Sequence, residues 1–230
     1  MLKSKFYLII PASGIGSRFD GDIPKQYTLM QNGKTILDNT IEVFIKNGNF
    51  AKIIIALNES DKFFKDSIFY NNSEIITVIG GKERFLSVKN ALDKLTEIAD
   101  KNDFVCIHDG VRPCIKNADI NNLLQKIDAH EIGGLLVSPV VDTLKLSKNG
   151  KITTINRNNI FNALTPQCYR AEVLQAALKN VIKNNLTITD DASSIELFGK
   201  NGLAVVGDKN NLKITTKDDL KLANSILEIK

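Results

Sequence analysis

The residues best suited to chemistry lie in a glycine-containing turn near the N-terminus. A short apolar run leads into PASGIGSR at residues 11–18, and Lys25 follows shortly after Arg18. Because Gly14 and Gly16 lack a Cβ, backbone N–H groups there can approach an anion closely. Arg18 and Lys25 can supply the positive charge that a triphosphate lacks. The segment is therefore typical of a phosphate-holding turn after a strand.

Two common nucleotide motifs are excluded in this turn. The dinucleotide pattern G-x-G-x-x-G would need a glycine where Phe19 stands, and no G-K-[ST] follows Gly16 as it would in a Walker loop. On its own, the segment is equally consistent with ordinary tight-turn chemistry. The rest of the chain has to decide between these interpretations.

Composition limits the class of protein. The chain has 230 residues, of which 43% are hydrophobic and 24% are charged, and this favours a single domain over residues 1–230. The net charge of +4 is spread along the chain, so no nucleic acid partner is expected. No run of about 18 apolar residues suggests a membrane span, and the first residues do not resemble a signal peptide. We therefore expect a cytoplasmic protein without a membrane partner.

The cysteines and histidines do not suggest a metal or disulfide framework. Cys106, Cys114 and Cys168 are odd in number and lack C-x-x-C spacing, so reduced thiols are expected, with neither a disulfide nor a zinc site. The 2 histidines are too few for a histidine-based metal site, and His108 is interpreted as a packed residue. No serine or cysteine triad is recognisable either.

Arginine is used sparingly, which makes each arginine informative. Only five of the 30 lysines and arginines carry a guanidinium, whose planar donors suit phosphate better than an ammonium does. The five are Arg18, Arg84, Arg112, Arg157 and Arg170. Four of them fall in the loop motifs discussed here.

The order of apolar runs predicts an α/β fold. Short β-branched runs alternate with amphipathic stretches, which indicates a Rossmann-like, doubly wound, mostly parallel sheet with helices on both faces. The expected strands are Tyr7–Ile10, Lys52–Leu57, Ile75–Ile79, Asp103–Ile107, Gly134–Val137 and Leu203–Val206. The expected helices are Thr35–Asn47, Asp61–Tyr70, Glu83–Ile98, Ala118–Ala129, Ala171–Lys183, Asp190–Phe198 and Lys217–Leu227. In such a sheet, ligands bind at the carboxyl ends of the strands.

The alternation fails between Val140 and Pro166. Two β-prone runs, Thr143–Leu146 and Lys151–Ile155, flank an Asn-Gly turn and predict a hairpin. An isolated hairpin is marginal in water, so it is expected to pack on another surface, with a second subunit as the first candidate. A lid on the same chain is the alternative.

Two more turns follow expected strands. Gly80 and Gly81, with Ser87 in the next helix, can hold a base or a phosphate through the backbone, although a plain helix start would have the same composition. Asp109 ends an apolar strand, and Arg112 lies three residues later. A carboxylate there is well placed to hold Mg²⁺ against nucleotide phosphates, while a structural Asp–Arg pair is the alternative.

Three later segments complete the set of polar motifs. Thr165 lies in a T-P-Q segment, Thr189 precedes D-D-A-S, and Lys213 lies two residues after Asn211. The segment at Thr189 could equally be a helix cap.

Taken together, the motifs resemble the 2-C-methyl-D-erythritol 4-phosphate cytidylyltransferase family over nearly the whole chain. The matching segments, in order, are PASGIGxR at 11–18, PKQY at 24–27, GGxxRxxSV at 80–88, HDxxRP at 108–113, PVxDTLK at 139–145, RxxIF at 157–161, LTPQ at 164–167, TDDAS at 189–193 and NxKIT at 211–215. The resemblance implies a nucleotidyltransferase fold, similar to GT-A, with a protruding β-hairpin arm.

The resemblance also implies an activity and a set of roles. The reaction would join CTP and 2-C-methyl-D-erythritol 4-phosphate into 4-diphosphocytidyl-2-C-methyl-D-erythritol and release pyrophosphate, with Mg²⁺ as the cofactor. Arg18, Lys25 and Lys213 would be catalytic. The nucleotide would contact Ala12, Ser13, Gly14, Gly16, Gly80, Gly81, Lys82, Ser87, Asp109 and Gly110. The other substrate would contact Asp109, Arg112, Thr143, Arg157, Thr165 and Thr189, and Asp109 would bind the metal.

In this family the hairpin arm, here residues 140–162, exchanges between the subunits of a homodimer. That would bring Thr143 and Arg157 to the partner's active site. Two other functions stay open at this point. Ribitol-5-phosphate cytidylyltransferases share the glycine turn and P-K-Q, and a non-catalytic nucleotide-binding regulator could use the same fold.

Overall fold

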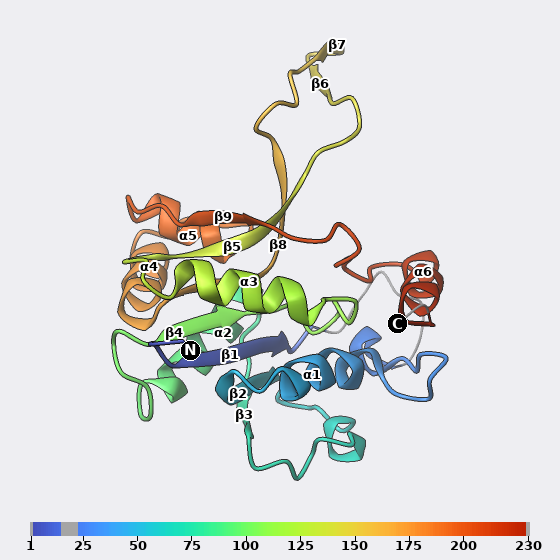
Figure 1. Cartoon of the computed structure of the whole chain (residues 1–230), viewed down its shortest axis with the longest axis vertical. Coiled ribbons are helices and arrows are strands. Elements are labelled where there is room, and N and C mark those ends of the chain that lie inside the picture. The colour runs from blue at the N-terminus through green and yellow to red at the C-terminus, as the bar shows by residue number, and fades with distance from the viewer. Residues whose placement is uncertain (1, 15–22, 229–230) are drawn as a thin grey trace.

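A seven-stranded sheet forms the centre of the protein. The computed structural model describes residues 2–14 and 23–228, and Figure 1 shows their arrangement. The strand order is β3-β2-β1-β4-β8-β5-β9. The strands are β1 Phe6–Ala12, β2 Phe50–Leu57, β3 Ile75–Ile79, β4 Phe104–Ile107, β5 Gly133–Pro139, β8 Phe161–Arg170 and β9 Leu203–Val206. Of these described strands, only β8 runs antiparallel to its neighbours. The predicted mostly parallel α/β sheet is confirmed.

Helices cover both faces of this sheet, which explains why β1 is apolar at successive positions. The helices are α1 Ile36–Asn47, α2 Arg84–Leu95, α3 Asn117–Ile127, α4 Ala171–Lys183, α5 Asp191–Leu197 and α6 Lys217–Glu228. Phe6, Leu8 and Ile10 pack in one cluster with α1 and α3. Tyr7 and Ile9 pack on the opposite face with α2, α4 and α5. A strand buried on both sides reads as a continuous hydrophobic run.

The segment expected as a helix over Asp61–Tyr70 is not one. The structure has only a short 3₁₀ turn there, η2 at Phe64–Asp66. The carboxylate of Asp61 accepts hydrogen bonds from the N–H groups of Phe63 and Phe64, and the hydroxyl of Ser67 accepts one from Phe69. Side chains that bond to nearby backbone compete with helix formation.

Strand β8 was not predicted. Its sequence contains Pro166, and a proline in a run argues against a central strand. The pairing with β5 passes from Gln167 opposite Leu135 to Ala163 opposite Val137, with an irregularity between them. The proline therefore lies where the ladder is interrupted, and the strand continues on both sides of it.

A two-stranded hairpin, β6 Lys145–Lys148 and β7 Lys151–Thr154, forms as predicted about its Asn-Gly turn, with strand ends shifted by one or two residues. Asn149 and Gly150 both have positive φ, 51° and 75°, as a two-residue type I′ turn requires. All eight strand residues are exposed, and Figure 1 shows the hairpin at the end of an arm that projects from the sheet.

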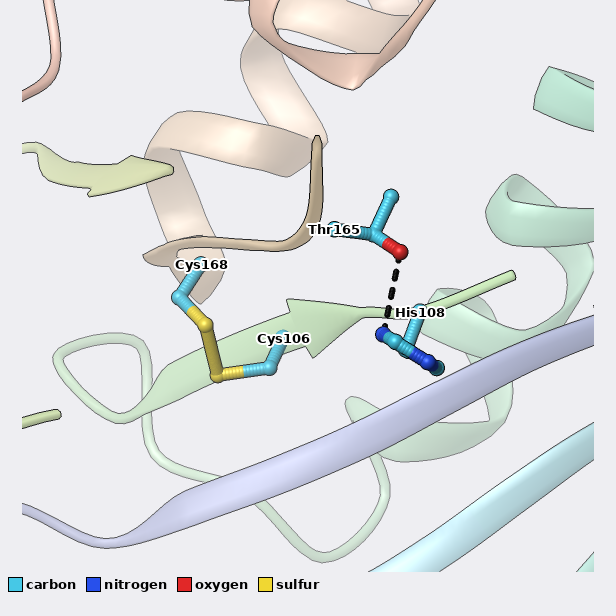
Figure 2. The surroundings of a disulfide bond; sticks show 4 residues. All are labelled: Cys106, His108, Thr165 and Cys168. Carbon is cyan, nitrogen blue, oxygen red and sulfur yellow. Dashed lines mark hydrogen bonds between the residues drawn. A yellow bond between two sulfur atoms is a disulfide. The ribbon is translucent and has the colours of Figure 1, made fainter. Parts of the chain in front are cut away.

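The prediction of reduced cysteines is wrong for two of the three. Cys106 of β4 lies directly opposite Cys168 of β8, and the structure joins them as a disulfide (Figure 2). The prediction relied on spacing in the sequence, where 62 residues separate the pair. Antiparallel pairing with the unpredicted strand β8 brings them together.

This arrangement predicts the outcome of thiol counting. When the protein is unfolded without a reductant and treated with iodoacetamide, we expect one of its 3 cysteines, Cys114, to be alkylated. After reduction, all three should react, and intact mass spectrometry distinguishes the two states. Three adducts in the unreduced sample would contradict the disulfide.

Candidate active site

The glycine turns predicted from the sequence meet at the carboxyl ends of the parallel strands. Gly14 follows β1, Gly80 follows β3 and Asp109 follows β4. These strands belong to the parallel run β3-β2-β1-β4, so their carboxyl ends lie at the same edge of the sheet. Open α/β sheets bind their ligands at this edge. The structure therefore provides the framework that the sequence analysis expected.

A first cavity of about 240 Å³ opens at this edge. Nine of the predicted site residues line it, namely Ala12, Ser13, Gly14, Lys25, Gly81, Lys82, Asp109, Gly110 and Lys213. Gly80 and Ser87 do not line it, but both lie against Ser13, which does. Gly16 and Arg18 lie outside the residues that the structure describes.

The P-K-Q segment is fastened to the glycine turn by a side chain. The amide nitrogen of Gln26 donates to the carbonyl oxygens of Ala12, at 2.8 Å, and Gly14, at 3.1 Å. Gln26 is buried and lies in the 3₁₀ turn η1, Lys25–Tyr27, so the position of Lys25 is tied to the end of β1. This explains why a lysine distant from the turn in sequence lines the same cavity.

The second glycine pair is packed too closely for any side chain. A Cβ added to Gly80 would lie 2.6 Å from the Cβ of Ser13. The hydroxyl of Ser87 accepts a hydrogen bond from the N–H of Gly81 at 3.0 Å and lies 2.8 Å from the hydroxyl of Ser13. Glycine and serine thus join the turns after β1 and β3 into one wall.

A second cavity, of about 260 Å³, adjoins the first. It is lined by three further predicted residues, Arg112, Thr165 and Thr189. Arg84, Asp109 and Lys213 line both cavities, so they form the wall between the two. A site with two adjacent cavities and a charged wall can hold two anionic substrates side by side.

Asp109 is the charged centre of this wall. Its carboxylate lies 3.0 Å from Nε of Arg84, 3.2 Å from Nε of Arg112 and 3.1 Å from Nζ of Lys213. Burial by itself raises the pKa of this carboxyl, but the charges of Arg84, Lys213 and Arg112 outweigh burial and hold the pKa far below its usual range. Asp109 is therefore ionised at neutral pH.

Arg84 extends this charge network to the start of α5. Its Nη1 lies 2.8 Å from Oδ2 of Asp191, a fully buried carboxylate. The side chain of Gln167 donates to Asp190 and accepts from the N–H of Ala192, each at 2.8 Å, which fixes the same helix start against β8. Thr189 is positioned at the second cavity by these contacts.

The arm residues are separate from both cavities. Thr143 and Arg157 are exposed and lie in the segments that lead to and from the hairpin, which projects away from the sheet in Figure 1. Neither residue lines a cavity of this chain together with the other predicted residues.

The surroundings of Asp109 do not fit a metal ligand. Both of its oxygens already face cations, and the described residues contain no group of three or more histidine, cysteine or acidic side chains that could hold a metal ion. A divalent cation would be repelled by three neighbouring positive charges. The sequence-based assignment of the metal to Asp109 therefore gains no support from this arrangement.

Four residues of the site lie in the sequence motifs but had no predicted role in binding or catalysis. Arg84 and Asn211 lie in the motif loops, Gln167 lies in T-P-Q, and His108 was interpreted as packed. The scarcity of arginine was a usable signal for Arg84. Gln167 lies in β8, and His108 and Asn211 form hydrogen bonds with Thr165 of β8. Their importance therefore depends on a strand that the sequence did not reveal.

Comparison with known proteins gives a consistent result. The family model for 2-C-methyl-D-erythritol 4-phosphate cytidylyltransferase matches residues 6–229. The Ruthia magnifica protein of that name is 44% identical, with 98% of both chains covered, and the Buchnera aphidicola protein is 40% identical, with 99% of this chain and 95% of that protein covered. The crystal structure of Francisella tularensis 2-C-methyl-D-erythritol 4-phosphate cytidylyltransferase has a TM-score of 0.84 and 41% identity, covering 97% of this chain and 100% of the other.

No helix in the described part of the chain has both the length and the apolar character needed to cross a bilayer.

The charge network predicts a large effect of Arg84 on stability. In Arg84→Met, the buried carboxylate of Asp191 loses its cationic partner, and the free energy of unfolding should fall by about 3 kcal/mol. Lys89→Met, on the same helix, removes only an exposed pair with Asp93 and should change it by less than about 0.5 kcal/mol. Urea unfolding of both variants tests this. Equal, small losses would contradict the role of the Arg84 bridge.

The buried imidazole of His108 predicts a pH dependence of stability. Burial is the main cause that lowers its pKa from 6.5 to about 4. Between pH 6.5 and about 4, the imidazole is protonated in the unfolded chain but not in the folded protein. The contribution of His108 to stability is therefore complete above pH 6.5 and is lost as the pH falls toward 4. The loss should be about 3 kcal/mol.

Urea unfolding at a series of pH values measures this loss. His108→Asn cannot titrate, so its stability should be flatter in the same window. Identical slopes for the two proteins would assign the pH dependence to other groups.

Proposed function

The chain belongs to the 2-C-methyl-D-erythritol 4-phosphate cytidylyltransferase family, and from this premise we propose that it transfers the cytidylyl group of CTP to 2-C-methyl-D-erythritol 4-phosphate, releasing pyrophosphate. The observation that carries the proposal is the pair of adjoining cavities, which share Arg84, Asp109 and Lys213 as a common wall. A transfer between two anions needs both of them held at one junction.

The first cavity is suited to the nucleotide. Its lining of Ala12, Ser13, Gly14 and Gly81 offers backbone groups close to a ligand, and Lys25 adds charge beside the glycine turn. We assign the cytosine and ribose to the side of Gly80, Gly81, Lys82 and Ser87, and the triphosphate to the turn after β1. Gly16 and Arg18 retain their predicted roles at the triphosphate, and Gly110 its role at the nucleotide.

The second cavity is suited to the sugar alcohol phosphate. Arg112 supplies a guanidinium, while Thr165 and Thr189 supply hydroxyl groups to its lining. We assign this cavity to 2-C-methyl-D-erythritol 4-phosphate. The ionised Asp109 between the cavities keeps Arg84, Arg112 and Lys213 within reach of both ligands.

The proposed step is an in-line displacement at phosphorus. An oxygen of the substrate phosphate forms a bond to the α-phosphorus of CTP, while the bond from that phosphorus to its bridging oxygen breaks. Pyrophosphate leaves with the electron pair. Lys213 lines both cavities, which supports a role for its ammonium, with Lys25 and Arg18, in opposing the charge that develops on the α-phosphoryl oxygens. The attacking phosphate is already an anion, so no protein nucleophile is required.

A divalent cation is proposed to accompany the nucleotide. Mg²⁺ commonly binds phosphate oxygens and retains several waters in place of a full set of protein ligands. Because the carboxylate of Asp109 already faces three cations, we assign it to holding those cations in place.

The arm, residues 140–162, is proposed to act in a homodimer. Its hairpin strands are fully exposed, and a hairpin without a core needs a surface to pack on. Thr143 and Arg157 lie away from the cavities of their own chain, which supports their use at the site of a second copy. The cytoplasmic location remains a prediction from the sequence.

The proposed function is tested by pyrophosphate release. The purified protein should turn over CTP with 2-C-methyl-D-erythritol 4-phosphate, and far less with ribitol 5-phosphate or with ATP. Lys213→Met should reduce kcat by about 100-fold or more, because it removes a cation at the reacting phosphates. Lys221→Met, which replaces an exposed lysine of α6 that pairs with Asp218, is the control and should leave kcat unchanged.

If no pyrophosphate is released with either sugar alcohol phosphate, a non-catalytic nucleotide-binding regulator becomes the better hypothesis. If ribitol 5-phosphate is preferred, the protein is a ribitol-5-phosphate cytidylyltransferase.

The exchanged arm is tested by mixing two inactive variants. In a heterodimer of Arg157→Ala and Lys25→Ala subunits, one site carries both lesions and the other carries neither. Random exchange of equal amounts should therefore restore about a quarter of wild-type activity per subunit. Each variant incubated alone is the control. A mixture that has exchanged subunits but stays inactive would show that Arg157 serves its own chain.

A further inference from the structure

His108 is buried at the end of β4, next to Asp109, and has no role in the proposed reaction. Its ring joins a closed circuit of hydrogen bonds. Nδ1 lies 2.9 Å from the hydroxyl of Thr165 (Figure 2), and Nε2 lies 3.1 Å from the carbonyl oxygen of Arg112. Arg112 donates to the carbonyl of Asn211 at 2.7 Å, and Asn211 donates to the carbonyl of Thr165 at 2.6 Å.

The direction of each bond at the ring follows from its partners. A carbonyl oxygen can only accept, so Nε2 must carry the proton that it donates to Arg112. The ring is fully buried, and its two hydrogen bonds go to a carbonyl and a hydroxyl group, both of them uncharged, so the imidazole is in its neutral form. In a neutral imidazole the other nitrogen has no proton, so Nδ1 accepts. The hydroxyl of Thr165 therefore donates to Nδ1.

The hydroxyl of Thr165 can therefore take part in only one kind of hydrogen bond with a ligand, as an acceptor. A threonine hydroxyl has one proton and two lone pairs. Its proton is committed to His108, and one lone pair accepts the N–H of Asp109 at 3.3 Å. Thr165 lines the second cavity, so only the remaining lone pair can face a ligand there. A phosphate dianion has no proton to donate to it, whereas the hydroxyl of a sugar alcohol does.

We propose that His108 is a positioning residue that fixes the hydroxyl of Thr165 as a hydrogen-bond acceptor, so that Thr165 recognises a hydroxyl group of the acceptor substrate and not its phosphate. The inference rests on the proposed function, because it assigns the second cavity to a sugar alcohol phosphate. It specifies which partner donates in the hydrogen bond between Thr165 and the substrate, and it gives a role to His108. The same circuit ties Asn211 to Arg112 and so holds together the loops on either side of the cavity.

Two variants of His108 separate its two hydrogen bonds. A glutamine amide reaches the position of Nε2, so His108→Gln keeps a donor for the carbonyl of Arg112 and loses the acceptor for Thr165. An asparagine amide reaches the position of Nδ1, so His108→Asn keeps that acceptor. We expect His108→Gln to raise the KM for 2-C-methyl-D-erythritol 4-phosphate by about tenfold, with the KM for CTP and kcat changed by less than about threefold. His108→Asn should recover most of this loss.

A double substitution tests whether the effect passes through Thr165. Thr165→Val keeps the shape of the side chain and removes the hydroxyl, so it should raise the same KM by about tenfold. Added to His108→Gln, it should raise the KM no further, because the two changes remove one interaction. Additive effects, or equal losses for CTP, would show that His108 serves packing alone.

The tautomer gives a test that needs no turnover. ¹⁵N NMR of histidine-labelled protein should show His108 as the neutral Nε2–H form from pH 6 to 8. His130→Asn leaves one histidine and makes the assignment direct. His130 lines neither cavity, so the variant should keep wild-type activity. An Nδ1–H tautomer would overturn the proposal, even if His108→Gln failed to fold.

Failure of the proposed function has a different signature. It would be the absence of pyrophosphate release by the wild-type protein, with the tautomer unaffected.

Discussion

The site depends on one buried carboxylate that is shared by three cations. Arg84 comes from the start of α2, Arg112 from the turn after β4, and Lys213 from the segment before α6, and all three reach Asp109 within 3.2 Å. Without this carboxylate, three like charges would repel one another in a partly dry site. With it, they are held at one point and still outnumber the two acids, Asp109 and Asp191, that pair with them. The wall thus keeps a net positive charge that attracts anions, while the two carboxylates reduce the repulsion between its three cations.

The same carboxylate connects chemistry to the fold. Its loop follows β4, and β4 pairs with β1 on one side and β8 on the other. The first neighbour brings the glycine turn, and the second brings Thr165 and Gln167. Two cavities with different linings arise because Asp109 stands between a parallel neighbour and an antiparallel one.

Much of this arrangement was predictable from the sequence. The buried parallel strands have continuous apolar runs, and the motifs that follow them meet at one edge by a general rule of α/β sheets. Strand β8 was not predictable in the same way, because Pro166 interrupts its pairing and its polar residues are typical of a loop. Two features that the sequence did not reveal depend on that strand. The disulfide of Cys106 and Cys168 and the hydrogen bond of His108 to Thr165 both exist only once β8 lies beside β4. The failed helix near Asp61 has a separate cause in local side-chain bonding.

The arm and the second cavity are built from a single strand, β8, which begins at Phe161 at the root of the arm and carries Thr165 four positions later. That distance is roughly 13 Å along a strand. Because side chains alternate between the faces of a sheet, one residue inserted between these positions would turn Thr165 to the opposite face or force a new bulge. At the tip, by contrast, a Cβ added to Gly150 would meet no atom within 4 Å. Insertions and deletions should therefore be tolerated at the tip of the arm and not at its root, so that the arm can change in length only at the end that is most distant from the cavities of its own chain.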